Sequence, residues 1–68
     1  MNEEVLNHTL RKFLKKVGIT SQREIEMAIR DATANGRLKG NESLIAKATI
    51  RVEGLNLTSD VEGDVELE

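Results

Sequence analysis

The fold of this chain depends on residues 14–25, which are LKKVGITSQREI. Two signals in this stretch are typical of a helix boundary. Gly18 follows an apolar repeat, where glycine commonly ends a helix. Ser21 is followed three residues later by Glu24, which is the capping-box pattern that opens a helix. We therefore expect two helices, at about 3–17 and about 21–35, joined by Gly18-Ile19-Thr20.

Upstream of this stretch, the sequence is typical of an amphipathic helix. Apolar residues recur at helical spacing, namely Val5, Leu6, Leu10, Phe13, Leu14 and Val17. Asn2 is a suitable N-cap. Glu3 and Glu4 at the start, and Lys15 and Lys16 at the end, suit the helix dipole.

Downstream, the apolar stripe is narrower and consists of Ile25, Ala28, Ile29 and Ala32. Glu26 and Arg30 stand four residues apart in the favourable order, and Gly36 is expected to end the helix. Met27 lies on the opposite side of this helix. Because an internal core does not require it there, Met27 is a candidate partner-binding residue.

The period changes from about 3.6 to 2 after a polar connector at 36–45, which indicates a β-hairpin at about 46–67. Ala46, Ala48, Ile50 and Val52 alternate with polar residues, and so do Val61, Val65 and Leu67. We expect Ile50 to pair with Leu67 and Val52 with Val65. The turn then falls near Thr58-Ser59, with Gly54 opposite Gly63.

Leu55 and Leu57 do not fit this alternation, because their parity is opposite to that of Ile50 and Val52. One alternative is a bulge near Gly54 that returns both leucines to the core face. The other is that both point outward, which would make them candidate partner-binding residues.

These patterns together predict an α+β fold of the order α-α-β-β, forming a single domain over 1–68. Both helices are expected to cover one face of the hairpin. The expected core consists of Val5, Leu6, Leu10, Phe13, Leu14, Val17, Ile25, Ile29, Ile50, Val52, Val65 and Leu67.

Several segments together carry a resemblance to a known family. They are RKFLKKVGITSQREIE at 11–26, LKGNE at 38–42, Ala46-Lys47 and Gly54-Leu55. The chain resembles a family of short, uncharacterised bacterial proteins known as a domain of unknown function. The resemblance implies a free-standing bacterial protein of about this length, and it supplies no activity, ligand or functional residue.

The residue types argue against an enzyme, a metal site or a cofactor site. There is no Cys, and the single His8 has no evident acid–base partner or pocket. Asp60, Glu62, Asp64 and Glu66 alternate along a strand, so they are expected to form its solvated face rather than a calcium loop. We therefore expect no catalytic, metal-binding or cofactor-binding residue.

Arg11, Lys12 and Lys15 lie on one polar helix face and are candidate phosphate contacts. Two helices and a hairpin would also fit a helix-turn-helix with a wing. Acidic residues in the second helix and in the hairpin count against DNA binding, and the only aromatic, Phe13, lies on the core face. Weak nucleic-acid binding is therefore the alternative function, and we expect it to be unlikely.

The leading expectation is a non-enzymatic interaction module that acts by self-association or by binding an unidentified protein partner. A homodimer through the hairpin edge is the specific form that we expect. No apolar run approaches the roughly 20 residues of a membrane helix, so we expect no membrane association. The absence of cysteine favours a cytoplasmic location, and the family resemblance implies a bacterial one.

Overall fold

The computed structural model describes residues 1–68, and its elements are one helix followed by two strands. The helix α1 spans Glu3–Ala34, β1 spans Ser43–Val52 and β2 spans Leu57–Glu66. The chain divides into two compact units, Met1–Arg37 and Leu38–Glu68, which are described separately. The α+β class is confirmed, whereas the prediction of two helices is wrong.

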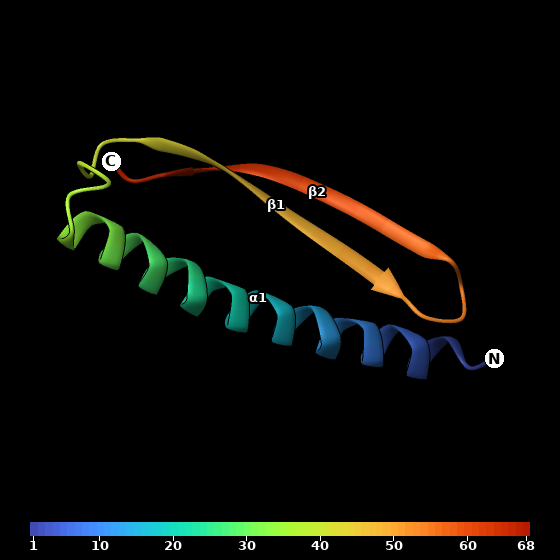
Figure 1. Ribbon diagram of the computed structural model, residues 1–68. Coiled ribbons are helices and arrows are strands. Elements are labelled where there is room, and N and C mark those ends of the chain that lie inside the picture. The colour runs from blue at the N-terminus through green and yellow to red at the C-terminus, as the bar shows by residue number, and fades with distance from the viewer. The chain divides into compact units, whose positions relative to one another are not determined.

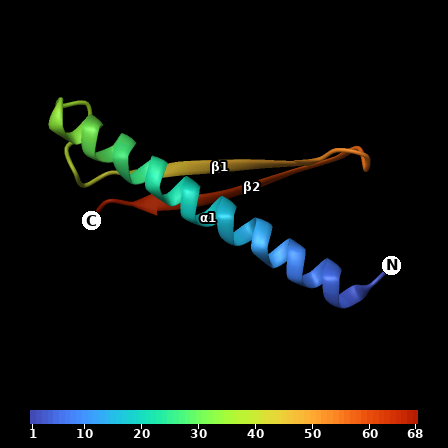
Figure 2. The same cartoon turned by 90° about the horizontal axis from the view of Figure 1, so that it is seen from below.

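The helix α1 continues without a break through Gly18-Ile19-Thr20, as Figures 1 and 2 show. Gly18 does not adopt the positive φ that a helix-ending glycine requires. A glycine inside a helix costs about 1 kcal/mol relative to alanine, which favourable segments on both sides offset. Ser21 therefore lies inside the helix, and the predicted capping box at Ser21 and Glu24 is wrong.

Both ends of α1 lie where the sequence predicted them, to within a residue. The Asn2 side chain accepts hydrogen bonds from the backbone N–H groups of Glu4 and Val5, at 3.0 and 3.2 Å. At the other end, Gly36 has a φ of 83°. The Arg37 N–H donates to the Ala32 carbonyl at 2.9 Å, which is the bond of a Schellman motif. Lys15 and Lys16 lie in the helix interior, so their predicted role at a helix C-terminus is wrong.

The hairpin has a different register from the predicted one. Ten consecutive antiparallel pairs join β1 to β2, from Ser43 with Glu66 to Val52 with Leu57. The turn is therefore Glu53-Gly54-Leu55-Asn56 rather than Thr58-Ser59. Gly63 lies directly opposite Ala46, and not opposite Gly54 as predicted. Gly54 and Asn56 adopt positive φ values of 86° and 53°, which glycine and asparagine tolerate best.

This register resolves the parity of Leu57. Once the turn is placed before Leu57, that residue is in phase with Val61 and Val65 on one face of β2. No bulge is needed, because the ten pairs are consecutive. Leu55 lies in the turn itself and is 69% exposed.

Neither unit has a buried core of its own. No side chain in the chain is buried, and Phe13, at the centre of the predicted core, is 47% exposed. The same holds for every other member of the predicted core set, since all are half-buried or exposed. The apolar faces of the helix and of the hairpin are therefore uncovered within their own units.

Candidate interaction surfaces

One apolar stripe runs along the whole of α1. Its residues follow spacings of four, four and three, which repeat every eleven residues: Leu6, Leu10, Leu14, Val17, Ser21, Ile25, Ala28 and Ala32. Eleven residues are about three turns, so these positions lie on one side of the helix. The first half of the stripe consists of large apolar residues. The second half begins with the polar Ser21 and has smaller side chains, with Ile25 as its one large apolar residue.

The hairpin has one apolar and one polar face. Leu44, Ala46, Ala48, Ile50 and Val52 of β1 share a face with Leu57, Val61 and Val65 of β2. The other face carries the four carboxylates of β2, at Asp60, Glu62, Asp64 and Glu66, as the sequence predicted. Two residues depart from this division. Ser59 lies opposite Ile50 on the apolar face, and Ile45 lies opposite Asp64 on the polar face, where it is 78% exposed.

Asp60 is the best-connected carboxylate of the polar face. The Thr49 hydroxyl donates a hydrogen bond to its Oδ1 at 2.7 Å, and the Lys47 ammonium lies 3.8 Å from its Oδ2. Thr49 is directly opposite Asp60, and Lys47 is opposite Glu62. These contacts favour the observed register and offset the positive charge of β1 with a carboxylate of the same hairpin.

Glu42, in the connector before β1, was missed by the sequence prediction. Its carboxylate accepts hydrogen bonds from the backbone N–H groups of Lys39, Gly40 and Asn41, at distances between 2.8 and 3.2 Å. The hydrogen bonds from Lys39 and then Gly40 lower the pKa of Glu42 below its ordinary value, because they favour the charged carboxylate. Three successive N–H groups that converge on one anion form a backbone nest. In this chain, the occupant of that nest is the chain's own side chain.

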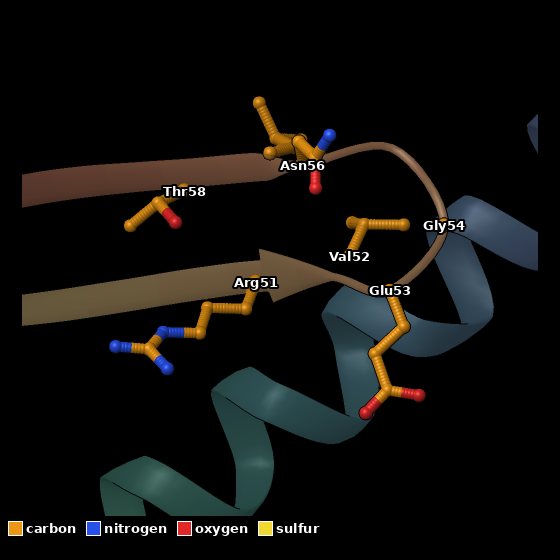
Figure 3. A pocket seen from close by; sticks show the side chains of 7 residues that line it. Arg51, Val52, Glu53, Gly54, Asn56 and Thr58 are labelled. Atoms are coloured by element: carbon orange, nitrogen blue, oxygen red, sulfur yellow. The ribbon is translucent and has the colours of Figure 1, made fainter.

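A hollow of about 320 Å³ lies at the turn end of the hairpin, and residues 51–54 and 56–58 line it. Figure 3 shows that the side chains of Arg51 and Glu53 extend in different directions from this end of β1. The lining therefore does not bring an acid and a base together around a shared point.

The candidate partner-binding residues lie in both units. Leu55 and Leu57 lie at the turn end of the hairpin, 69% and 45% exposed, whereas Met27 lies on α1 and is 59% exposed. Leu55 lies in the turn and Leu57 is the first residue of β2, two positions further along the chain. Their role in binding stays a prediction.

Arg11, Lys12 and Lys15 are exposed on α1, and none of them forms a salt bridge. The only salt bridge within α1 joins Glu26 to Arg30 at 3.6 Å, as their spacing predicted. Because α1 is a single helix, the predicted helix-turn-helix architecture is wrong, whereas nucleic-acid binding through Arg11, Lys12 and Lys15 stays a prediction.

No group of three or more His, Asp or Glu side chains is arranged so that it could hold a metal ion. His8 is exposed on α1. The helix lacks the combination of length and apolar character that crossing a membrane requires.

Comparison with known proteins identifies the family. The model of DUF6494, a family of unknown function, matches residues 1–68, so the chain belongs to this family. The resemblance inferred from the sequence is thereby confirmed at the level of the family. No curated protein and no solved structure gives a significant match.

Proposed function

We propose that this protein is a small non-enzymatic interaction module that acts by self-association. The observation that carries the proposal is the lack of any buried side chain in either unit. An isolated helix owes most of its stability in proteins to packing of its apolar face. An isolated two-stranded hairpin is marginal in water. Both elements therefore need a surface that covers their apolar side.

A second copy of the chain supplies such a surface, because it carries the same apolar faces as the first copy. Closed two-fold dimers are the commonest soluble oligomers, because one surface serves both partners. Leu55, Leu57 and Met27 are exposed apolar side chains that such a contact could cover. A different protein partner is the alternative occupant, and the experiment below separates the two.

The test is the concentration dependence of thermal unfolding. If folding is linked to dimer formation, each tenfold increase in chain concentration adds about 1.4 kcal/mol per dimer. For a dimer of two 68-residue chains, that gain raises the unfolding midpoint by about 3–6 °C. A midpoint that does not change with chain concentration would mean that the single chain is stable unaided or needs a different partner. Either reading would overturn self-association.

A further inference from the structure

The two strands of the hairpin each have one side without a neighbouring strand, because the sheet is β1-β2 only. Proteins protect such edges with prolines, bulges, short strands or charged residues. The chain has no proline, and its ten consecutive pairs contain no bulge. At ten residues each, neither strand is short. Within the hairpin itself, charge is therefore the one protective device left.

The charge protects β2 more strongly than β1. This strand carries Asp60, Glu62 and two further carboxylates with no basic residue, so two copies of it repel each other. In β1 the only charged residues are Lys47 and Arg51. Lys47 is paired with Asp60 of its own hairpin at 3.8 Å, which reduces its repulsion of a second copy. The edge of β1 is thus the less protected one.

We propose that β1 pairs antiparallel with β1 of a second copy, with the two-fold axis at Ala48, to form one four-stranded sheet. The proposal rests on the proposed self-association and names its surface. Four strands exceed the two that are marginal alone. The pairing is closed, because each copy uses its one free β1 edge and leaves the acidic β2 strands outermost.

The register follows from face, charge and overlap, because an axis farther from the middle of Ser43–Val52, such as Ala46 or Ile50, pairs fewer residues. Directly opposite residues have their side chains on the same face of a sheet. The apolar residues of the two β1 strands therefore share a face only if the two-fold axis passes through a residue. An axis through a peptide bond would place apolar residues opposite polar ones. An axis at Lys47 would place two Lys47 side chains opposite each other. An axis at Thr49 would place Lys47 opposite Arg51. With the axis at Ala48, Lys47 is opposite Thr49, and no like charges are paired directly.

The same register continues the apolar face across the axis. Leu44 is then opposite Val52 of the second copy, and Ala46 is opposite Ile50 of the second copy. The small Ala48 side chains meet on the axis. Leu55, in the turn, and Leu57, the first residue of β2, lie outside the paired residues 44–52.

Cysteine cross-linking tests this arrangement, and the chain has no native cysteine to interfere. Directly opposite Cα atoms of antiparallel strands lie about 4.5–5.5 Å apart, which is within the range of a disulfide. The Ala48→Cys variant should therefore form a disulfide-linked dimer on mild oxidation. The matched control is Val61→Cys, on the same rung and face. Its two copies would be three strand spacings apart, about 14 Å, which is too far.

A second pair of variants tests the register even if Ala48→Cys does not fold. Chains with Ala46→Cys and chains with Ile50→Cys should cross-link when they are mixed. Neither should cross-link alone, because its copies would be four residues apart along the strand, about 13 Å.

The outcomes separate this proposal from the proposed function. Cross-linking of Val61→Cys instead of Ala48→Cys would overturn the β1 assignment and implicate β2. A concentration-dependent unfolding midpoint without cross-linking at 48 or between 46 and 50 would leave self-association intact and overturn the β1 surface. A concentration-independent midpoint without cross-linking would overturn both.

Discussion

Replacing Gly18 with alanine tests whether α1 is continuous. A Cβ atom added at Gly18 would meet no atom within 4 Å, and the backbone there does not have a positive φ. Alanine is favoured over glycine in a helix interior by about 1 kcal/mol. We therefore expect Gly18→Ala to stabilise the protein by about 1 kcal/mol, or roughly 4–8 °C in the unfolding midpoint.

Gly36 provides the matched control, because it lies past the helix end with a φ of 83°. A Cβ atom there also meets nothing within 4 Å, so only backbone conformation distinguishes the two glycines. A side chain in the left-handed region costs about 1–2 kcal/mol. Alanine also lowers the conformational entropy of the unfolded chain, which offsets part of this cost. Gly36→Ala should therefore destabilise the protein by about 1 kcal/mol.

Urea unfolding followed by helical circular dichroism measures both changes, at one fixed chain concentration because association shifts apparent stability. Opposite signs for the two alanine variants are the expected result. A loss of stability in Gly18→Ala comparable to that in Gly36→Ala would refute the reasoning, because it would indicate a left-handed glycine, and hence a turn, at residue 18.

Three further results are expected. Ser21→Ala should stabilise the protein by about 0.5 kcal/mol, because Ser21 is inside the helix, where alanine is favoured. Asn2→Ala should destabilise it by about 1 kcal/mol, because Asn2 is the N-cap. Destabilisation by Ser21→Ala in the same unfolding series would indicate a cap at residue 21. The Glu42 carboxyl should titrate below its ordinary pKa by NMR. The charged Glu42 carboxylate stabilises the fold at pH values above the pKa that Glu42 has in the unfolded chain, and this stabilisation is lost as the pH falls through its folded-state pKa. Glu42→Gln should therefore remove this part of the pH dependence of stability. An ordinary pKa for Glu42 would contradict the nest. Duplex DNA should bind more weakly than about 10⁻⁴ M at physiological salt, and micromolar, salt-sensitive binding that is lost in Lys12→Glu/Lys15→Glu would contradict this expectation.

The helix shows how local signals can mislead. Gly18, and Ser21 with Glu24, each match a helix-end pattern, yet the apolar stripes on either side of them are in phase. Leu14 and Ile25 are eleven residues apart, as are Val17 and Ala28, and eleven residues are about three turns. In two helices separated by a turn, the two apolar stripes would not need to be in phase. The shared phase of the two stripes, rather than the local capping patterns, therefore indicates that α1 is continuous.

The hairpin error has a similar origin. The alternation in β1 and the acidic face of β2 were predicted correctly, but the turn was placed too late. Leu57 shares its parity with Val61 and Val65, which places it on β2 and the turn before it. Gly54 and Asn56 are residues that such a turn favours.

The nest around Glu42 could not be predicted in this way. It depends on three backbone N–H groups that converge on one carboxylate, and the residue types at 39–41 do not determine that convergence. The absence of a core within each unit was also beyond the sequence pattern. Periodicity identifies the apolar face of an element without identifying what covers it.

Sedimentation equilibrium of the unmodified chain tests self-association most directly. Chain concentrations from about 10 to 500 μM bracket weak, transient association. We expect the mass to rise with concentration toward twice the 7.6 kDa of the single chain. A mass that stays at 7.6 kDa up to the highest concentration would contradict the proposal that this protein acts by self-association.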